Sequence, residues 1–290
     1  MFERLLVTTD LSEASENMLK CLGPLRRVGA REATLLHVMD VRDVGGLYIS
    51  LLNLIDPRLA HLRAVMSEQG FETRVETPLG KPSREINRFA AAGGYSVIVA
   101  GTHGESLAKD VLLGSVVHGL LQEARKPVLL IPFNVLGKTE EERCQALCGD
   151  FFRHVLFATD FSETADRAFS YLRHIVESTK PQTTLYHAQD KARIEPHLKD
   201  KLEEFNRVDM ERLERLEKDL AAAGAPKVHK VIEYGRPAKL LVDKANSGAF
   251  SLLVMGNQGR GYLAEAFLGR VAHHVVHHAA IPVLLVPMAA

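Results

Sequence analysis

Two glycine-rich segments have the spacing of an anion-binding loop. One runs from Gly101-Thr102-His103-Gly104 to Gly114-Ser115, and the other from Gly256-Asn257-Gln258-Gly259 to Gly269-Arg270, 155 residues later. Each follows an apolar run typical of a strand and ends where a helix is expected to begin. Glycines let the backbone approach a ligand, and the amides and positive dipole end of a helix favour a phosphate. The spacing therefore predicts a nucleotide-binding protein, with a phosphate loop in each half.

An aspartate after the first apolar run of each half is the second candidate for ligand binding. Asp10 lies in Val7–Glu13, and Asp160 lies in the matching segment Phe157–Glu163. In a doubly wound sheet, ligands bind beyond the carboxyl ends of the strands where the strand order reverses, so each aspartate is expected to face its glycine loop. There it would hydrogen-bond a sugar or base, or help to place a cation. The alternative is that Asp10 and Ser12 only cap the following helix.

The similarity of the two halves extends further, which indicates an internal duplication. Leu35–Asp40 returns 150 residues later, whereas Gly80-Lys81-Pro82 returns 155 residues later as Gly235-Arg236-Pro237. The five additional residues of the second half must therefore lie between Asp190 and Gly235. That interval holds its long predicted helix, where a change of length is easily accommodated.

Short apolar runs alternate with amphipathic stretches throughout the chain. Strands are expected near 4–9, 33–39, 72–77, 96–101 and 127–132, and near 154–159, 183–189, 227–234, 251–256 and 282–287. Helices are expected near 12–28, 48–69, 82–92 and 114–125, and near 162–178, 196–223, 236–247 and 269–280. Apolar runs without alternation are typical of parallel strands covered on both faces, and right-handed crossovers then give a doubly wound sheet. We expect an α/β fold of two tandem Rossmann-like domains with helices on both faces.

The long helix predicted over 196–223 carries an apolar stripe at helical spacing. The stripe consists of Leu198, Leu202, Phe205, Leu213, Leu216 and Leu220. Many of the residues between them are charged and form i, i+4 pairs of opposite sign, which we interpret as a solvated face.

Length and charge fit two ordinary domains. The chain has 290 residues, with 36 Lys+Arg balanced by 36 Asp+Glu, so binding to nucleic acid or to an anionic membrane is not expected. No run approaches the roughly 18 apolar residues of a membrane span. A strand pattern begins at Arg4 with no room for a signal peptide, so a cytoplasmic protein is expected. We place domain 1 at 1–137, a linker at 138–151 and domain 2 at 152–290.

The histidines are weaker candidates for chemistry. His37 and His187 lie on the second strand of each half and are expected to be core or crevice-lining residues with a hydrogen-bonded ring. His273–His278 contains two i, i+4 histidine pairs, a spacing that can hold zinc or nickel. Because no further ligand motif accompanies them, we favour a partly exposed, pH-sensitive helix face and assign no metal site.

The three cysteines are Cys21, Cys144 and Cys148. Their odd number gives no disulfide framework, and reduced thiols are expected. The i, i+4 spacing of the last two leaves a shared metal or joint oxidation as the alternative.

The combination of these motifs resembles the universal stress protein family. The resemblance rests on Val155–Ala165, on Leu36-His37-Val38, and on Gly-x2-Gly-x9-Gly-Ser at 101–115 followed by Pro127-Val128-Leu129-Leu130. It covers nearly the whole chain as a tandem pair. It implies a five-stranded parallel sheet of order 3-2-1-4-5 in each half. It also implies pairing at the fifth strand, here between the two halves, and allows a homodimer.

The nucleotide-binding branch of that family implies ATP, with Mg²⁺ or Mn²⁺ bound through the phosphates. In the first half, Thr9 and Asp10 would contact the ribose and base, and the Val38 main chain would read the adenine edge. The resemblance assigns the phosphates to Gly101, Gly104, Gly114, Ser115 and the Val116 amide.

The second half matches the family pattern less completely. The corresponding residues are Thr159, Asp160, Ala188, Gly256, Gly259, Gly269 and Arg270. Arg270 replaces the motif's hydroxyl and adds bulk, although its guanidinium can itself pair with a phosphate. Three outcomes stay open: weakened or altered binding, no binding, and binding rescued by Arg270. We favour the first two and expect the isolated second half to bind ATP more weakly than the isolated first half.

These observations indicate an ATP-binding regulatory or stress-response protein, whose nucleotide occupancy modulates its conformation or its binding of an unidentified protein partner. The alternatives are a slow ATPase or phosphotransferase and a nucleotide-free interaction module. The chain lacks the Ser-Gly-Gly-x-Asp-Ser loop of ATP pyrophosphatases, the His-x-Gly-His of class I synthetases and a Gly-x4-Gly-Lys-(Ser/Thr) loop. Efficient turnover is therefore not expected, and no catalytic residue is assigned.

Overall fold

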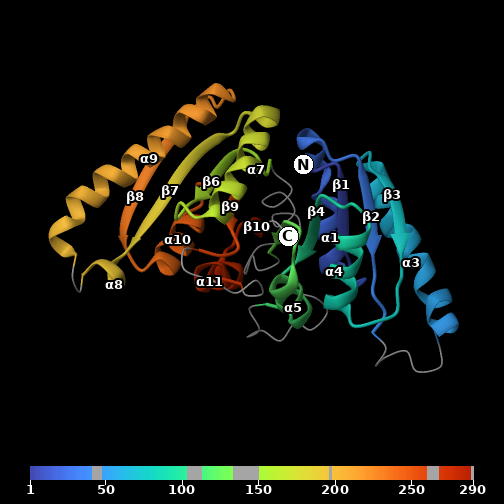
Figure 1. Cartoon of the computed structure of the whole chain (residues 1–290). Helices are drawn as coiled ribbons and strands as arrows, with labels where there is room; N and C mark the ends of the chain where they lie inside the picture. Colours follow the sequence, from blue (N-terminus) through green and yellow to red (C-terminus); the bar gives the residue numbers. More distant parts are fainter. Residues whose placement is uncertain (41–47, 103–112, 133–149, 196–197, 260–267, 289–290) are drawn as a thin grey trace. The chain divides into compact units, whose positions relative to one another are not determined.

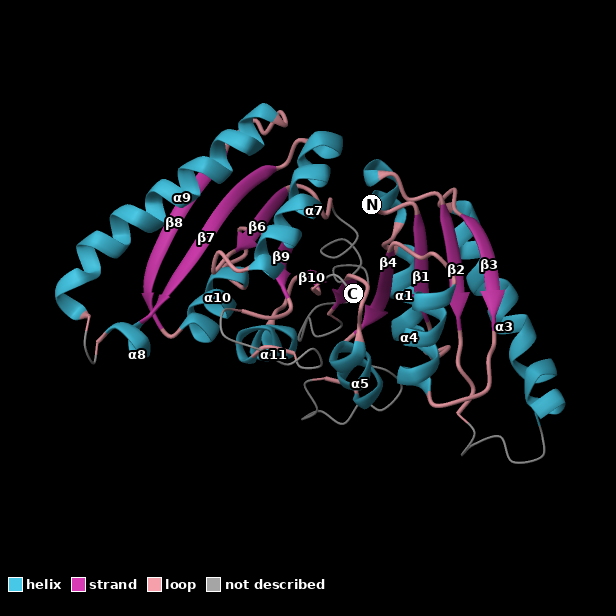
Figure 2. Cartoon of the chain, viewed as in Figure 1, coloured by secondary structure: helices cyan, strands magenta, loops and turns pink. Residues whose placement is uncertain are grey.

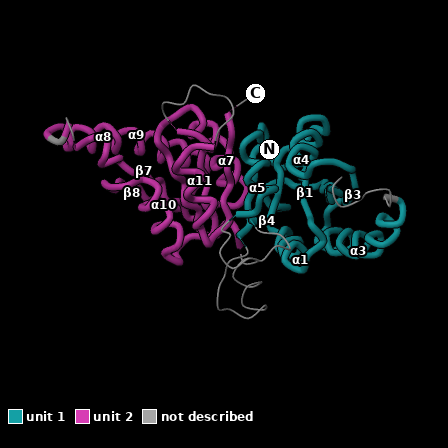
Figure 3. The backbone as a smooth tube through the Cα atoms, turned by 90° about the horizontal axis from the view of Figure 1, so that it is seen from below, with its two compact units in different colours: residues 1–149 teal, residues 150–290 magenta. Residues whose placement is uncertain are grey.

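A computed structural model describes residues 1–40, 48–102, 113–132, 150–195, 198–259 and 268–288 (Figure 1). The chain divides into two compact units, Met1–Gly149 and Asp150–Ala290, which are coloured separately in Figure 3. The predicted linker over 138–151 lies outside the described residues up to residue 149, so the linker and the domain boundaries stay predictions. No helix in the described part of the chain is long and apolar enough to span a membrane.

The first unit contains a five-stranded parallel sheet in the order β3-β2-β1-β4-β5 (Figure 2). Its strands are β1 (Arg4–Thr8), β2 (Glu32–Leu36), β3 (Glu72–Glu76), β4 (Val97–Gly101) and β5 (Val128–Ile131). Its α-helices are α1 (Glu13–Lys20), α3 (Tyr48–Glu68), α4 (Pro82–Ala92) and α5 (Ser115–Glu123). α1 packs on α3 and α4 packs on α5, as right-handed crossovers onto two opposite faces require.

The second unit repeats this order as β8-β7-β6-β9-β10, again with parallel strands. Its strands are β6 (His154–Ala158), β7 (Gln182–Asp190), β8 (Val228–Gly235), β9 (Leu252–Gly256) and β10 (Val283–Val286). Its α-helices are α7 (Glu163–Thr179), α8 (Lys191–Ile194), α9 (Leu202–Ala222), α10 (Pro237–Ala245) and α11 (Arg270–His278). Both units therefore have the predicted 3-2-1-4-5 order, and the predicted fold class is confirmed.

The central strands explain why the apolar runs do not alternate with polar residues. The middle residues of β1 and β6 have no exposed surface: Leu5, Leu6, Val7, Val155, Leu156 and Phe157. Helices cover both faces of these strands, so successive side chains are buried whichever way they point. The edge strand β3 differs, because Thr73 is buried while the residues on either side of it are exposed.

The helix predicted over 12–28 is interrupted in the structure. α1 ends at Lys20, and Gly23–Val28 forms a separate 3-10 helix with Pro24 in its first turn. Proline has no amide hydrogen and a fixed φ, so it begins a new helical turn more readily than it continues the previous one.

The sequence suggested that the additional residues of the second unit lengthen its long helix. The structure differs from this expectation. α3 and α9 are each 21 residues long. The connection before α9 is instead longer, and it contains the short helix α8 and a 3-10 turn at Lys199–Lys201. The insertion therefore adds structure beside the carboxyl end of β7.

Cys21 is the one cysteine among the described residues, and it is disulfide-bonded. The expectation of reduced thiols is wrong for this residue.

Glu16 holds α1 against α3 through ion pairs with three basic side chains. Its carboxylate lies 2.9 Å from Lys20 Nζ, 2.7 Å from the Arg58 guanidinium and 3.2 Å from His61 Nε2. The hydrogen bond from Lys20 is the largest cause that lowers the pKa of Glu16 to about 2, from an ordinary 4.5, while partial burial opposes the shift.

We expect Glu16→Gln to remove part of the acid sensitivity of the fold. The pKa of Glu16 is lower in the folded state than in the unfolded chain, so its contribution to stability is present above about pH 4.5 and is lost as the pH falls toward 2. The thermal midpoint of the variant, followed by circular dichroism, should be lower than that of the wild type at pH 6 and approach it at low pH. A difference that stays constant over this range would contradict the assignment.

Candidate functional site

A tight turn after the first strand of each unit positions the candidate aspartate. In the first unit, Asp10 Oδ1 accepts hydrogen bonds from the Ser12 amide at 3.1 Å and the Ser12 hydroxyl at 2.6 Å. The intervening Leu11 has a φ of 67°, a left-handed conformation that is uncommon for a branched side chain. The second unit repeats the turn, with Phe161 at a φ of 57° and Asp160 Oδ1 accepting from the Ser162 amide at 3.1 Å.

Ser12 caps α1, as the alternative interpretation of this segment predicted. Its hydroxyl accepts a hydrogen bond from the Ser15 amide at 3.1 Å. We expect Ser12→Ala to destabilise the first unit by about 1 kcal/mol, because the amide loses its partner. Ser12→Thr keeps a capping hydroxyl and should lose less. Equal loss in the two variants, measured by denaturant unfolding, would show that the cap contributes little.

The main chain after β2 faces the end of β1. The strand predicted over 33–39 ends at Leu36, and the amides of His37 and Met39 donate to carbonyls of the segment that leads out of β3, at 3.0 and 2.9 Å. Backbone groups alternate sides along an extended chain, so the Val38 amide and carbonyl point toward the β1 side. The binding of an adenine edge by the Val38 main chain stays a prediction.

The two glycine loops end at the same kind of helix N-terminus. Gly114 caps α5 and Gly269 caps α11, both with extended backbone and without a side-chain capping bond. The Gly114 amide donates to Thr102 O at 3.0 Å, and the Gly269 amide donates to Asn257 O at 2.8 Å. The first-turn amides of both helices thus have no side-chain cap, which leaves them suited to an anion.

Two glycines of the second loop have close neighbours, and those of Gly256 include main chain. A Cβ at Gly256 would lie 2.7 Å from Thr164 Oγ1, and one at Gly259 would lie 2.6 Å from Asp160 Oδ2. Real Cβ atoms do not approach that closely, so only glycine fits without a rearrangement. The predicted aspartate and the predicted glycine loop therefore meet in the second unit.

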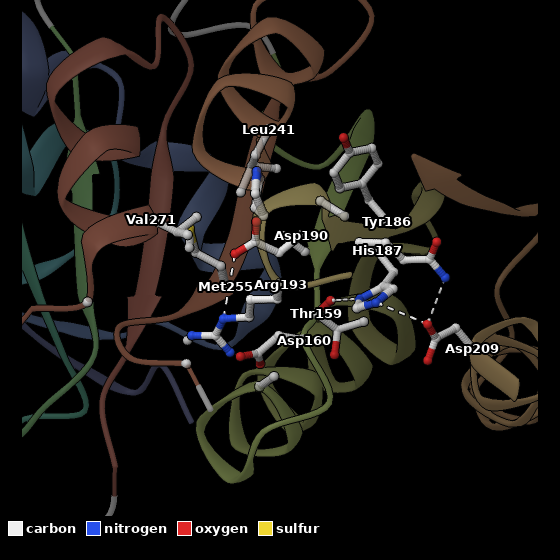
Figure 4. Close-up of a pocket in the computed structure, with 18 of the residues that line it drawn as sticks. Thr159, Asp160, Tyr186, His187, Asp190, Arg193, Asp209, Leu241, Met255 and Val271 are labelled. Carbon is white, nitrogen blue, oxygen red and sulfur yellow. Dashed lines mark hydrogen bonds and ion pairs between the residues drawn. The ribbon is translucent and has the colours of Figure 1, made fainter. Parts of the chain in front are cut away.

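A pocket of about 590 Å³ opens at the carboxyl ends of β6, β7 and β9 (Figure 4). All seven residues predicted for the second half line it: Thr159, Asp160, Ala188, Gly256, Gly259, Gly269 and Arg270. The matching positions in the first unit are at or after the ends of β1, β2 and β4 and at the start of α5. They hold Thr9, Asp10, Val38, Gly101, Gly114, Ser115 and Val116. Val116 is 38% exposed. Gly104 lies outside the described residues. The volume is in the range of small-molecule sites.

The helix α8, the segment after it and the start of α9 supply a wall that the sequence did not predict. The pocket is lined by Ile194 of α8, by Leu198, by Phe205 and Val208 of α9, and by Leu241 of α10. A mostly apolar wall of this kind suits a flat ring system. The one sign of this wall in the sequence was the five-residue insertion after Asp190, which follows the second strand of the half and so lies near the predicted ligand site.

A buried polar cluster lies next to the pocket on the α9 side. His187 Nδ1 lies 2.7 Å from Thr159 O, and its Nε2 lies 3.4 Å from Asp209 Oδ2. The same carboxylate accepts from Gln189 Nε2 at 3.0 Å and pairs with Arg212 at 3.4 Å. The hydrogen-bonded ring expected for His187 is present, but its carboxylate partner was not predicted. Figure 4 shows His187 between the end of β6 and Asp209.

The histidine pairs of α11 stack on the helix surface. The ring centroids of His273 and His277 are 4.2 Å apart, and those of His274 and His278 are 4.3 Å apart. Among the described residues, no group of three or more His, Cys, Asp or Glu side chains is arranged to hold a metal ion.

Comparison with known proteins identifies the family. The model of the Universal stress protein family matches residues 1–132 and 151–287. Universal stress protein MJ0577 of Methanocaldococcus jannaschii is 27% identical over 154 residues, which cover 45% of this chain and 95% of that protein. A universal stress protein of Thermus aquaticus is 33% identical over 139 residues, which cover 47% of this chain and 98% of that protein.

One solved structure is similar over both units together. A universal stress protein from Archaeoglobus fulgidus DSM 4304 matches with a TM-score of 0.75 and 27% identity, over 99% of this chain and 96% of that chain. A structure of a universal stress protein from Pseudomonas aeruginosa UCBPP-PA14, at 17% identity and a TM-score of 0.64, has the same fold. Because the family match covers each half separately, the chain belongs to the universal stress protein family as a tandem of two such domains.

Proposed function

We propose that this chain binds adenine nucleotides and acts as a regulatory stress-response protein, whose occupancy modulates its conformation or its binding of a protein partner. The observation that carries the proposal is the second-unit pocket, where a carboxylate, a glycine loop and an open helix N-terminus meet. It opens at the carboxyl ends of parallel strands beside the point where the strand order reverses. This is the position at which doubly wound sheets bind nucleotides.

In the first half we assign the ligand as ATP, with Mg²⁺ or Mn²⁺ held through the phosphates. Thr9 and Asp10 would contact the ribose and base, and the Val38 main chain would contact the adenine edge. The phosphates would be held by Gly101, Gly104, Gly114, Ser115 and the Val116 amide. The open N-terminus of α5 supports this assignment, because its first residue carries a small hydroxyl that leaves room for phosphate oxygens.

We further propose that domains at 1–137 and 152–290, joined by a linker at 138–151, pair through their fifth strands, and that the chain can also form a homodimer. Pairing of this kind would let nucleotide binding in one half alter the surface presented to a partner. A cytoplasmic location is part of the proposal.

The test is to identify what the purified full-length protein carries and binds. Mass spectrometry of small molecules released on denaturation should find adenine nucleotide, and calorimetry should detect binding of Mg²⁺-ATP. Absence of both, with Mg²⁺-ATP at millimolar concentration, would overturn the proposal. Steady-state phosphate release at many turnovers per minute would favour the ATPase alternative instead.

A further inference from the structure

We propose that the second-unit pocket binds a nucleoside monophosphate without a divalent cation, and that Arg270 reads its phosphate. This inference rests on the proposed function, since it assumes that both halves are nucleotide sites. It goes further because it gives the two halves different ligands. The chain would then respond separately to a triphosphate and to a monophosphate.

The first observation is the charge of the pocket lining. Arg193 pairs with Asp190 at 3.6 Å, and Arg212 pairs with Asp209 at 3.4 Å. Arg270 is the remaining arginine of the lining, and it forms no ion pair with any described residue. Its single charge and the roughly +0.5 at the N-terminus of α11 lie together and match one phosphate monoester, which carries about −1.5 to −2 at pH 7. The other charged residues of the lining, Asp160 and Glu204, are carboxylates and add no positive charge for a longer phosphate chain.

The second observation is the position of Arg270. It is the first residue of α11, directly after Gly269, where α5 of the first unit begins with Ser115. A serine hydroxyl is an oxygen ligand of the kind that Mg²⁺ accepts, whereas a guanidinium repels a divalent cation and binds phosphate oxygens through two parallel hydrogen bonds. The first unit is thus suited to a metal-bound triphosphate, and the second to a metal-free phosphate.

The third observation is a carboxylate against the glycine loop. Asp160 Oδ2 lies so close to Gly259 that a Cβ there would be 2.6 Å from it. Without a divalent cation to screen it, a phosphate chain that extended from Arg270 toward Gly259 would meet this negative charge. A single phosphate held between Arg270 and the first turn of α11 would not need to extend that far.

A buried amide at the same end of the pocket also indicates a polar ligand. Asn257 lines the pocket and is 9% exposed, and its Oδ1 has no hydrogen-bond partner among the described residues. A buried polar atom without a partner is costly, and a side-chain amide can present either its oxygen or its nitrogen. With the nitrogen turned toward the pocket, Asn257 would donate to a phosphate oxygen beside Arg270.

The experiment measures the second site alone in the full-length chain. Gly114→Asp blocks the first-unit site, and calorimetry then compares AMP, GMP, CMP and UMP with Mg²⁺-ATP, in the presence and absence of EDTA. We expect one monophosphate to bind at least tenfold more tightly than Mg²⁺-ATP, with no effect of EDTA. Adding Arg270→Ser should weaken that binding about tenfold or more, as expected for a lost charge-assisted contact. The exposed Arg173→Ser, remote from the lining, should change nothing.

Each outcome of this experiment separates the inference from the proposed function. Tighter binding of Mg²⁺-ATP than of every monophosphate, or monophosphate binding that survives Arg270→Ser, would overturn the inference. No nucleotide binding in the Gly114→Asp protein would also overturn it, provided that the wild type binds Mg²⁺-ATP. If the wild type binds no nucleotide either, the proposed function itself fails. Thermal midpoints of the variants establish that each is folded.

Discussion

Gly114→Asp is expected to lower the affinity of the first unit for ATP about 100-fold or more, because like charges brought together at a binding site cost several kcal/mol. The new carboxylate would stand at the cap of α5, where the phosphates are proposed to bind. Calorimetry with Mg²⁺-ATP on the full-length protein measures the effect. A variant that binds ATP as the wild type does would place the phosphates elsewhere.

The substitution is well suited to this test because the backbone accepts it. Gly114 has a φ of −64° and a ψ of 146°, which any residue adopts, and a Cβ there would lie 3.6 Å from Thr102 O, an ordinary contact. Aspartate is also a favoured capping residue, so α5 should be as stable as before or more so. Gly114→Asn is the matched control, since it fills the same space and caps the helix without a charge. It should weaken ATP binding less than aspartate does.

Much of the fold was predictable because its determinants are local. The unalternating apolar runs identify parallel strands, and the two copies of the pattern identify two domains. The interruption at Pro24 was not predicted, although a proline is typical of the first turn of a new helix. The strand order came from the resemblance to a family and not from the residues alone. Order depends on contacts between segments distant in the sequence.

In the candidate site, the sequence predicted only those residues whose type is characteristic of phosphate or sugar binding. Glycines and the aspartate carry such a signal, and in the second unit Asp160 and Gly259 do meet. The pocket wall on α8 was not predictable, because an insertion shows where a chain is longer but not what the extra residues contact. Asp209 was missed for another reason. It lies four residues after Phe205 and four before Leu213, so it shares the apolar face of α9. The charged residues of this helix were interpreted together as a solvated face, and Asp209 was not distinguished from them.

Asp209→Ala is expected to destabilise the second unit by about 3 kcal/mol, since it leaves two buried polar side chains, His187 and Gln189, without the carboxylate that they contact. Asp209 is 9% exposed, and its carboxylate is the shared partner of His187, Gln189 and Arg212. Arg212 can turn to water, because 41% of its side chain is exposed, but His187 and Gln189 cannot. The loss should therefore come mainly from these two side chains.

The measurement is denaturant unfolding of the full-length protein followed by far-ultraviolet circular dichroism, because the chain has no tryptophan. Asp209→Asn keeps the shape and one acceptor, so it should cost less than alanine and separate the charge from the hydrogen bonds. Asp243→Ala is the control: its carboxylate is 57% exposed and pairs with Lys239, so its loss should cost less than about 0.5 kcal/mol. If Asp209→Ala costs no more than this control, the cluster does not stabilise the fold.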